Sequence, residues 1–386
     1  MIYLDNAATT ALSPEVREAI EPFLGGSFGN PSSRHPLGLE AARAVEVARE
    51  QIAGALGAAD PECVVFTSGG TEANNLAVLG ASRTRKRHGR HVLFGPTEHP
   101  SVRASVQALA EGGYETESLK LVSGGALDLD AAQAALREDT VLVAQMAVNN
   151  EFGSRYPIEE LTTLVRGHAP HAHVHVDLVQ ALGKVPFSYL DLDADSVSLS
   201  AHKVHGLKGA GALVLKRATR VAPLVFGGGQ ERDVRPGTEN VVGIVALGAA
   251  IANAARSVSS TREHLSRLRA VLAETLARLG DSELLVPDGG GRNGHSPAIA
   301  ALRLPGPPAD VWMHHLEEKG VYTSVGSACH ARSKSVSPGL LALGLDDQSA
   351  RQVLRLSFAC TTNEEQVRAA GAALLEVATQ LRIDTA

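Results

Sequence analysis

The chain carries near its centre the segment Ser196-Val-Ser-Leu-Ser-Ala-His-Lys203-Val-His-Gly-Leu-Lys-Gly-Ala-Gly211. Apolar and polar residues alternate over residues 195–200, which predicts a strand, and the glycines that follow predict a turn. A second apolar run, residues 212–215, comes directly afterwards. We therefore expect Lys203 at the tip of a rigid strand pair, where glycines let the backbone and a ligand approach each other closely.

A carboxylate ends another predicted strand upstream, His173-Val-His-Val-Asp177, and Gln180 follows it. An isolated lysine is usually a solvated surface charge. A strand-end lysine together with a strand-end acid in one α/β domain, however, suits a pyridoxal phosphate site. In such a site the lysine forms a Schiff base with the cofactor, and the acid pairs with the pyridine nitrogen.

Further strands are predicted at residues 63–68, 91–94 and 141–148, with helical patterns between them. This alternation predicts an α/β fold with a large, doubly wound, mostly parallel sheet, whose ligands bind at the carboxyl ends of the strands. Five candidate residues come at such ends: Gly70, His99, Asn150, Asp177 and Lys203. Their expected convergence is the main structural argument for a site.

The turn Gly69-Gly70-Thr71 lies between a predicted strand and a predicted helix. Free backbone N–H groups and the helix dipole converge at such a turn, so it predicts a phosphate cradle. The pattern alone is weak, because many turns of this kind are Gly-rich with nothing bound. Neither a Walker lysine nor a G-x-G-x-x-G motif accompanies it.

Composition indicates an ordinary soluble globular protein, with 44% hydrophobic and 20% charged residues. The net charge of −6 argues against a protein that coats nucleic acid or a membrane surface. We find no signal peptide and no apolar run long enough to span a bilayer. The three cysteines fit a reducing compartment, so we expect a cytoplasmic enzyme.

Histidines at positions 171, 173 and 175 would share one face of a strand, which raises the alternative of a metal site. No carboxylate or cysteine completes a ligand set there. We therefore expect packed or edge-strand histidines and no metal.

The C-terminal third carries Gly326-Ser-Ala-Cys329-His330, followed by a Ser-rich stretch up to Pro338. A free cysteine is usually a small buried hydrophobe, and we expect Cys63 and Cys360 to be packing residues of that kind. The polar and basic neighbours of Cys329 instead favour an exposed, activated thiol.

The pattern divides the chain near Ile251. Residues 13–251 would form the large cofactor-binding domain, and residues 1–12 with 252–386 a smaller α+β domain that carries the cysteine loop. Helices are predicted at residues 38–56, 241–255 and 262–279, and an irregular Gly-rich loop at 227–240.

Taken together, these motifs resemble those of the cysteine desulfurases, the NifS/IscS-like branch of the class V aminotransferases, which have PLP fold type I. Single motifs are weak evidence, but nine in the expected order along nearly the whole chain are specific. The matching segments are Tyr3-Leu-Asp-Asn-Ala-Ala-Thr-Thr10, Gly29-Asn-Pro-Ser-Ser-Arg-His35, Thr67-Ser-Gly-Gly-Thr-Glu72, Thr97-Glu-His99, Asn149-Asn-Glu151, His175-Val-Asp177, Ser200-Ala-His-Lys203, Arg235-Pro-Gly-Thr238 and Gly326-Ser-Ala-Cys329.

The resemblance implies a homodimeric pyridoxal-phosphate enzyme that converts L-cysteine to L-alanine and leaves a persulfide on Cys329. A sulfur-acceptor protein would take that sulfur for iron–sulfur assembly, tRNA thiolation or DNA sulfur modification. Lys203 would form the Schiff base and move protons at Cα. Asp177 would keep the pyridine nitrogen protonated, while His99 would stack on the ring and assist proton transfer.

The resemblance also implies binding roles. Gln180 would hydrogen-bond the phenolic oxygen of the cofactor, and Asn150 would serve both the cofactor and the substrate. Arg355 would clamp the substrate carboxylate together with Asn150. The phosphate would be held by Gly70, Thr71, Ser200 and His202, with Thr238 reaching it from the partner subunit.

Two alternatives stay open at this point. One keeps the cofactor but changes the substrate, as in a selenocysteine lyase or a transaminase-like relative, although plain transamination needs no thiol at Cys329. The other is a non-catalytic sulfur-relay protein that retains only the fold, against which Lys203 and Asp177 argue.

The chain also departs from the family pattern. His330 stands where a hydroxyl residue is more usual, Leu178 replaces a small residue, and the usual Gly-Arg after Ser357 is missing, with Cys360 nearby. The long Ser-rich sequel resembles the group whose cysteine lies on a flexible loop. We therefore expect mobility at residues 328–337, and a resting Cys329 sulfur too far from Lys203 for direct attack.

Overall fold

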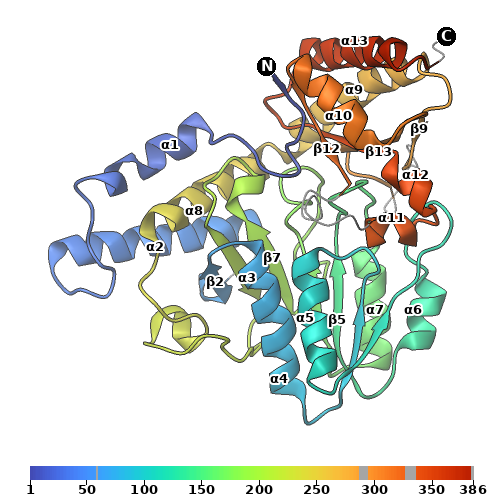
Figure 1. Cartoon of the computed structure of the whole chain (residues 1–386). Helices are drawn as coiled ribbons and strands as arrows, with labels where there is room; N and C mark the ends of the chain where they lie inside the picture. The colour runs from blue at the N-terminus through green and yellow to red at the C-terminus, as the bar shows by residue number, and fades with distance from the viewer. Residues whose placement is uncertain (58–59, 287–293, 327–335, 384–386) are drawn as a thin grey trace.

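The computed structural model describes residues 1–57, 60–286, 294–326 and 336–383 (Figure 1). Its centre is a seven-stranded sheet with the order β2-β8-β7-β6-β5-β3-β4. All of these strands except β8 run in the same direction. The strands are β2 (Val64–Thr67), β3 (His91–Phe94), β4 (Glu115–Ser118), β5 (Thr140–Met146), β6 (His173–Asp177), β7 (Ser196–Ser200) and β8 (Gly211–Leu215).

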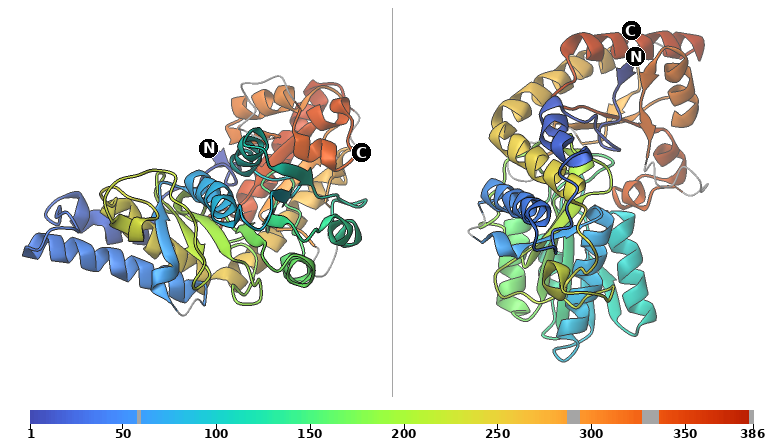
Figure 2. Two further views of the ribbon diagram at one scale, coloured as in Figure 1. Left: turned by 90° about the horizontal axis from the view of Figure 1, so that it is seen from below. Right: turned by 90° about the vertical axis from the view of Figure 1, so that its left-hand side faces the viewer.

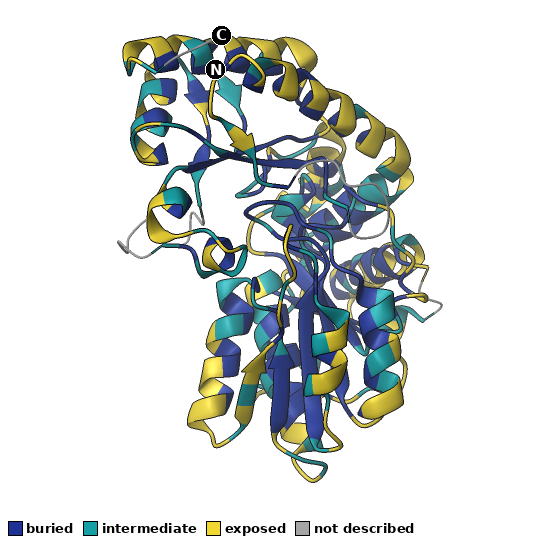
Figure 3. Cartoon of the chain, turned by 90° about the vertical axis from the view of Figure 1, so that its right-hand side faces the viewer, coloured by how far each residue is buried: buried dark blue, intermediate teal, exposed yellow. Residues whose placement is uncertain are grey.

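Helices cover both faces of this sheet, which confirms the predicted doubly wound fold. Neighbouring strand residues point into different cores: Val64 and Phe66 pack in one cluster, and Val65 packs in another. Figure 3 shows the buried sheet between helices whose outer faces are exposed. These helices are α1 (Pro14–Ile20), α2 (Pro36–Ala55), α3 (Gly70–Asn75), α4 (Ala81–Arg85), α5 (Pro100–Glu111), α6 (Leu129–Ala135), α7 (Ile158–His168) and α8 (Val241–Arg256).

The C-terminal part has its own sheet and its own apolar core. The sheet has the order β12-β13-β10-β9, and the core includes Leu4 and Ala7 from the beginning of the chain. Both chain ends lie at this end of the molecule (Figure 2). The elements are β9 (Glu283–Leu284), β10 (Ile299–Arg303), β12 (Ser324–Val325), β13 (Val353–Ser357), α9 (Val258–Leu276), α10 (Ala309–Glu318), α11 (Pro338–Ala342), α12 (Asp347–Arg351) and α13 (Glu364–Gln380).

The first residues of the chain join the C-terminal part to the large sheet. Strand β1 (Ile2–Tyr3) pairs in parallel with β11 (Val321–Tyr322). A few residues later, the backbone N–H of Thr10 donates to the carbonyl oxygen of His202, just after β7, at 2.9 Å. The predicted domain boundaries near residues 12 and 251 stay a prediction.

Several element boundaries differ from expectation, among them those of α9 and β5. Helix α9 begins at Val258 rather than at residue 262, and β5 ends at Met146 rather than at residue 148. Within the described part of the chain, no single helix has the length and apolar character needed to cross a membrane. Helices α8 and α9 meet those criteria only as a pair, which is bent by 73°.

Candidate active site

A cavity of about 310 Å³ lies at the carboxyl ends of the parallel strands. We call it the strand-end cavity. Its lining contains all the predicted site residues except Thr238 and Cys329. Those that line it are Gly70, Thr71, His99, Asn150, Asp177, Gln180, Ser200, His202, Lys203 and Arg355. Thr238 is exposed and does not line this cavity, and Cys329, with the rest of residues 327–335, lies outside the described residues.

Lys203 lies in the short 3-10 turn Ala201–Lys203 that directly follows β7. Its Nζ donates to the carbonyl oxygens of Ala7 and Ala8, at 2.6 and 2.7 Å. The N-terminal segment therefore lies against the lysine and holds its amino group in the strand-end cavity.

Asp177 ends β6, the strand that pairs in parallel with β7. The side chain is 6% exposed, and both oxygens accept hydrogen bonds. Oδ1 accepts from the backbone N–H of Val179 at 2.9 Å, and Oδ2 accepts from Asn74 Nδ2 at 2.7 Å. Donors on both oxygens therefore fix the position of this side chain at the end of the strand.

His99 is the N-cap of α5, and its Nδ1 accepts from the backbone N–H of Ser101 at 3.1 Å. The Ser101 hydroxyl lies 2.8 Å from the same nitrogen. Burial lowers the pKa of His99, although the Asp177 charge opposes that shift. A neutral imidazole at this position can lie against an aromatic ring without an unpaired charge.

The predicted phosphate cradle is formed where β2 turns into α3. Gly69 has φ of +154°, a conformation that favours glycine, and no side chain caps the helix that follows. Ser200 ends β7 and lies next to Gly70, since a Cβ at Gly70 would be 3.6 Å from the Ser200 Cβ, and His202 follows in the turn after β7. Burial, together with the Lys203 charge, lowers the pKa of His202 to about 4, so this ring is neutral.

Arg355 reaches the strand-end cavity from β13, in the C-terminal part of the chain. Its side chain is 2% exposed, and its guanidinium bonds the carboxylate of Asp5 at 2.7 Å and the carbonyl oxygen of Asn150 at 2.8 Å. Nε has no hydrogen-bond partner among the described residues. A buried guanidinium with an unused donor suits a carboxylate ligand.

Gln180 is held from two sides. Its Nε2 donates to the carbonyl oxygen of Ala7 at 2.9 Å, and its Oε1 accepts from Lys184 Nζ at 2.8 Å. Lys184 is 7% exposed, and burial, with repulsion from Lys203 and Arg355, lowers its pKa to about 7. The Lys184 ammonium can only donate, so in the protonated form this contact directs the Gln180 amide nitrogen away from Lys184.

Sequence reasoning missed Asn74, Ser101, Asp5 and Lys184. The spacing of Gln180 and Lys184 by four residues was an available signal for one of them, since residues four apart meet on a helical turn. The partners of Asn74 and Asp5 are 103 and 350 residues away in the chain, a distance that no local pattern spans.

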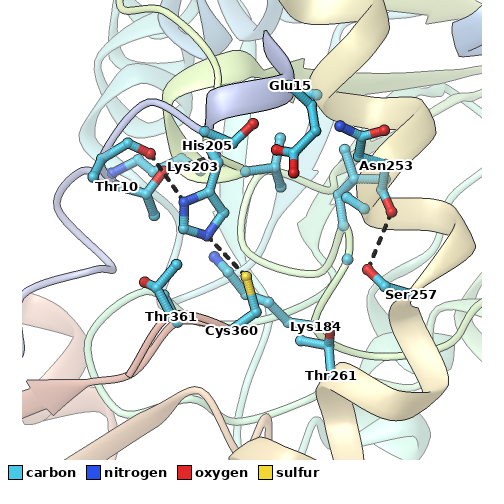
Figure 4. Close-up of a pocket in the computed structure, with 18 of the residues that line it drawn as sticks. Thr10, Glu15, Lys184, Lys203, His205, Asn253, Ser257, Thr261, Cys360 and Thr361 are labelled. Carbon is cyan, nitrogen blue, oxygen red and sulfur yellow. Dashed lines mark hydrogen bonds between the residues drawn. The ribbon is translucent and has the colours of Figure 1, made fainter. Parts of the chain in front are cut away.

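The expectation that Cys360 is a packing residue is wrong. Cys360 is exposed and lines a second cavity of about 620 Å³, which Lys203 lines as well (Figure 4). Its Sγ lies 3.3 Å from Nε2 of His205, whose Nδ1 donates to the carbonyl oxygen of Ala11 at 2.9 Å. Partial burial raises the pKa of this thiol. Cys63, by contrast, packs against the main core.

The predicted histidine strand begins at His173, and His171 lies before it, stacked on His88 with ring centroids 4.3 Å apart. His173 and His175 are both buried, and both hydrogen-bond the hydroxyl of Ser196, at 2.7 and 2.8 Å. The strand is therefore packed in the middle of the sheet.

With this architecture described, the chain can be compared with known proteins. The sequence profile of the aminotransferase class-V family matches residues 2–369. The chain belongs to this family.

Within the family, the similar proteins include desulfurases. The chain is 38% identical over 381 residues to the "Putative cysteine desulfurase IscS 1" of Bacillus subtilis (strain 168), covering 98% of this chain and 99% of the relative. A solved structure named NifS-like protein matches with a TM-score of 0.91 and 33% identity, over 98% of this chain and 99% of that one. The structure titled "SspA in complex with cysteine" matches with a TM-score of 0.80 and 30% identity, over 93% of this chain and 99% of that one. These comparisons confirm the resemblance and the predicted fold class.

Proposed function

We propose that this chain is a pyridoxal-phosphate-dependent L-cysteine desulfurase. One observation carries the proposal: Lys203 and Asp177, at the ends of the paired strands β7 and β6, share a cavity with the buried guanidinium of Arg355. The named relatives support the substrate, since several are cysteine desulfurases and one solved neighbour is titled as a cysteine complex.

The residues present fit pyridoxal phosphate. The strand-end cavity offers an amine for the aldehyde, a doubly hydrogen-bonded carboxylate for the pyridine nitrogen, and a Gly-rich helix start for the phosphate. Lys203, Asp177 and Gln180 would hold the reactive part of the cofactor. The cofactor, when bound, supplies an electron sink for the bonds broken at the substrate. Its phosphate would be held by Gly70, Thr71, Ser200 and His202.

Other side chains of the cavity would bind the substrate and transfer protons. Arg355 would bind the substrate carboxylate through its unused donor, with Asn150 beside it. Lys203 would accept and return protons at Cα, because its Nζ is held in place by two carbonyl oxygens. The Asp177 carboxylate would hold the proton on the pyridine nitrogen. His99 would cover the ring and exclude water.

Cys329, which lies outside the described residues, would receive the sulfur. Its thiolate would form an S–S bond to the substrate sulfur as the Cβ–S bond breaks. The three-carbon fragment would take up the protons lost and leave as alanine. The persulfide would then pass to a sulfur-acceptor protein.

We further propose a cytoplasmic homodimer. The cysteine content fits a reducing compartment. The dimer would place Thr238, which is exposed in this chain and does not line its own strand-end cavity, at the phosphate of the partner subunit.

Incubation with L-cysteine in the absence of a reductant tests the function. We expect one alanine per persulfide formed, with the persulfide mapped to Cys329 by mass spectrometry. Cys329→Ser should still bind cysteine and shift the visible absorbance of the cofactor, but form no persulfide. Cys63→Ser is the matched control and should behave like the parent. Alanine and sulfide production by Cys329→Ser at the parental rate would contradict the proposal.

A further inference from the structure

Asn74 lines the strand-end cavity and lies at the centre of a buried hydrogen-bond network. It lies in the first helix after the Gly-rich turn, and its side chain is 1% exposed. Nδ2 contacts Asp177 Oδ2 at 2.7 Å and Ser101 Oγ at 2.9 Å. Oδ1 lies 3.0 Å from Nε2 of His175. One amide thus joins Asp177, the Ser101–His99 pair and His175.

The direction of the hydrogen bonds toward His99 follows from the chemistry of the partners. The Asp177 carboxylate can only accept, so the amide atom beside it is the nitrogen. The second hydrogen of that nitrogen goes to Ser101 Oγ. The Ser101 hydroxyl, acting as acceptor there, donates its own proton to His99 Nδ1, at 2.8 Å. Nδ1 also accepts from the backbone N–H of Ser101. A neutral His99 must therefore carry its proton on Nε2.

The other side of the network agrees with this orientation. Asn74 Oδ1 accepts from Nε2–H of His175, so Nδ1 of His175 accepts from the Ser196 hydroxyl, at 2.8 Å. Ser196 Oγ in turn accepts from Nε2–H of His173, at 2.7 Å. Burial lowers the pKa of both histidines, that of His175 to about 4, so both rings are neutral, as this pattern requires. An Asn74 amide rotated by 180° would place two acceptors against each other at Asp177.

We propose that Asn74 is a positioning residue: by donating to Ser101 Oγ it turns the Ser101 hydroxyl proton toward His99 Nδ1, and with its other hydrogen it donates to the Asp177 carboxylate. Together with the backbone N–H of Ser101, that hydroxyl holds His99 in the Nε2–H tautomer. The tautomer leaves a donor, not an acceptor, on the His99 nitrogen that faces away from Ser101. The same amide sets the two polar groups that flank the predicted cofactor ring. A role of Asn74 in catalysis rests on the proposed function. The assignment of the His99 tautomer does not depend on that function.

Ring-¹⁵N histidine NMR of the cofactor-loaded protein tests the proposal, with His99→Gln to assign the signal. We expect the parent His99 to show a protonated Nε2 and an unprotonated Nδ1. Asn74→Leu removes the donor that orients the Ser101 hydroxyl, so the His99 Nδ1 signal should shift as its hydroxyl hydrogen bond weakens. Nε2 should stay protonated, because the backbone N–H of Ser101 still donates to Nδ1. Asn75→Ala is the matched control, since the adjacent Asn75 side chain donates within its own helix, to Thr71 O, and to no other residue in the described part of the chain. This control should leave the His99 signals unchanged.

Two results would overturn the proposal: a protonated Nδ1 in the parent, or unchanged His99 signals in a folded Asn74→Leu protein. If Asn74→Leu fails to fold, Ser101→Ala replaces it. That variant removes the hydroxyl donor and should move the His99 Nδ1 signal, and an unmoved signal would contradict the network. Because the readout needs no turnover, a protein that lacks desulfurase activity but shows this tautomer would refute the proposed function alone.

Discussion

Lys184 shows how a single buried cation can shape a site without touching the substrate. Its ammonium fixes the Gln180 amide, and Lys203 and Arg355 both repel its charge. Retaining such a residue costs stability, because the unfolded chain can protonate it freely and the folded chain near pH 7 can do so only in part. The cost must therefore depend on pH.

The first prediction concerns that dependence. The pKa of Lys184 falls from its ordinary 10.5 to about 7 on folding, so between these values the unfolded state binds more protons and stability rises with pH. Relative to Lys184→Met, the parent should gain up to about 1.4 kcal/mol of unfolding free energy per pH unit above 7. Urea unfolding of both proteins at pH 7, 8 and 9 measures this gain.

Lys120→Met, at an exposed lysine, provides the matched control for this measurement. A constant difference between Lys184→Met and the parent over the same range would show that Lys184 keeps its ordinary pKa in the folded protein.

At the scale of elements, strands and helices were predictable because their signals are local. Strands β5 and β7 are buried on both faces, and their apolar content is visible in the sequence. The N-cap Ser13 with Pro14 marks the start of α1. The π-helical stretch Leu76–Gly80 between α3 and α4 has no such mark, since its residues suit an ordinary α-helix equally well.

The site was predictable to the extent that strand ends converge. Asp177 and Lys203 could be placed together because parallel strands end at one edge of the sheet. The hydrogen bonds made by Asn74, Ser101 and Asp5 could not be predicted in this way. Their side-chain partners are far away in the sequence and are brought close only by tertiary packing. The prediction that Cys360 is a packing residue was wrong for a related reason. The residue type alone does not reveal that a cavity lies beside it.

The contact between β8 and the Gly-rich turn gives the next prediction. A Cβ at Gly211 would lie 2.6 Å from backbone atoms of Gly69 and 2.7 Å from the carbonyl oxygen of Leu199. Gly211→Ala should therefore separate β8 from the turn, at a cost of about 1–3 kcal/mol in unfolding free energy. Because Gly69 precedes the phosphate cradle, the variant should also release pyridoxal phosphate more readily.

Thermal unfolding and the visible absorbance retained after dialysis measure the two effects. Gly54→Ala is the control, since nothing lies within 4 Å of a Cβ there and α2 should become slightly more stable. Parental stability and parental cofactor retention in Gly211→Ala would show that the turn tolerates displacement.

At the scale of the whole molecule, the question is how one chain completes its site. The strand-end cavity draws residues from the N-terminal segment, the large sheet and β13, yet Thr238 lies outside its lining. If two chains share their sites, as we propose, each cavity uses Lys203 of one subunit and Thr238 of the other.

This sharing predicts complementation between two inactive variants. Lys203→Ala removes the reactive amine, and Thr238→Asp places a negative charge against the phosphate of the partner subunit. Each protein alone should be inactive. In a heterodimer, one site lacks both groups, while the other pairs an intact Lys203 with an intact Thr238. After random reassociation of equal amounts, activity should return to about a quarter of the parental value, because half of the dimers are mixed and each has one working site.

Mixing Lys203→Ala with Asp177→Asn supplies the control. Both of these substitutions alter groups that a cavity takes from its own chain, so no heterodimer of this pair has an intact site, and activity should stay at the level of the separate proteins. Alanine formation from L-cysteine after unfolding and refolding the mixtures together measures the outcome. If the first mixture stays as inactive as the second although mass spectrometry detects heterodimers, Thr238 does not serve the partner's phosphate, and each chain must complete its site alone.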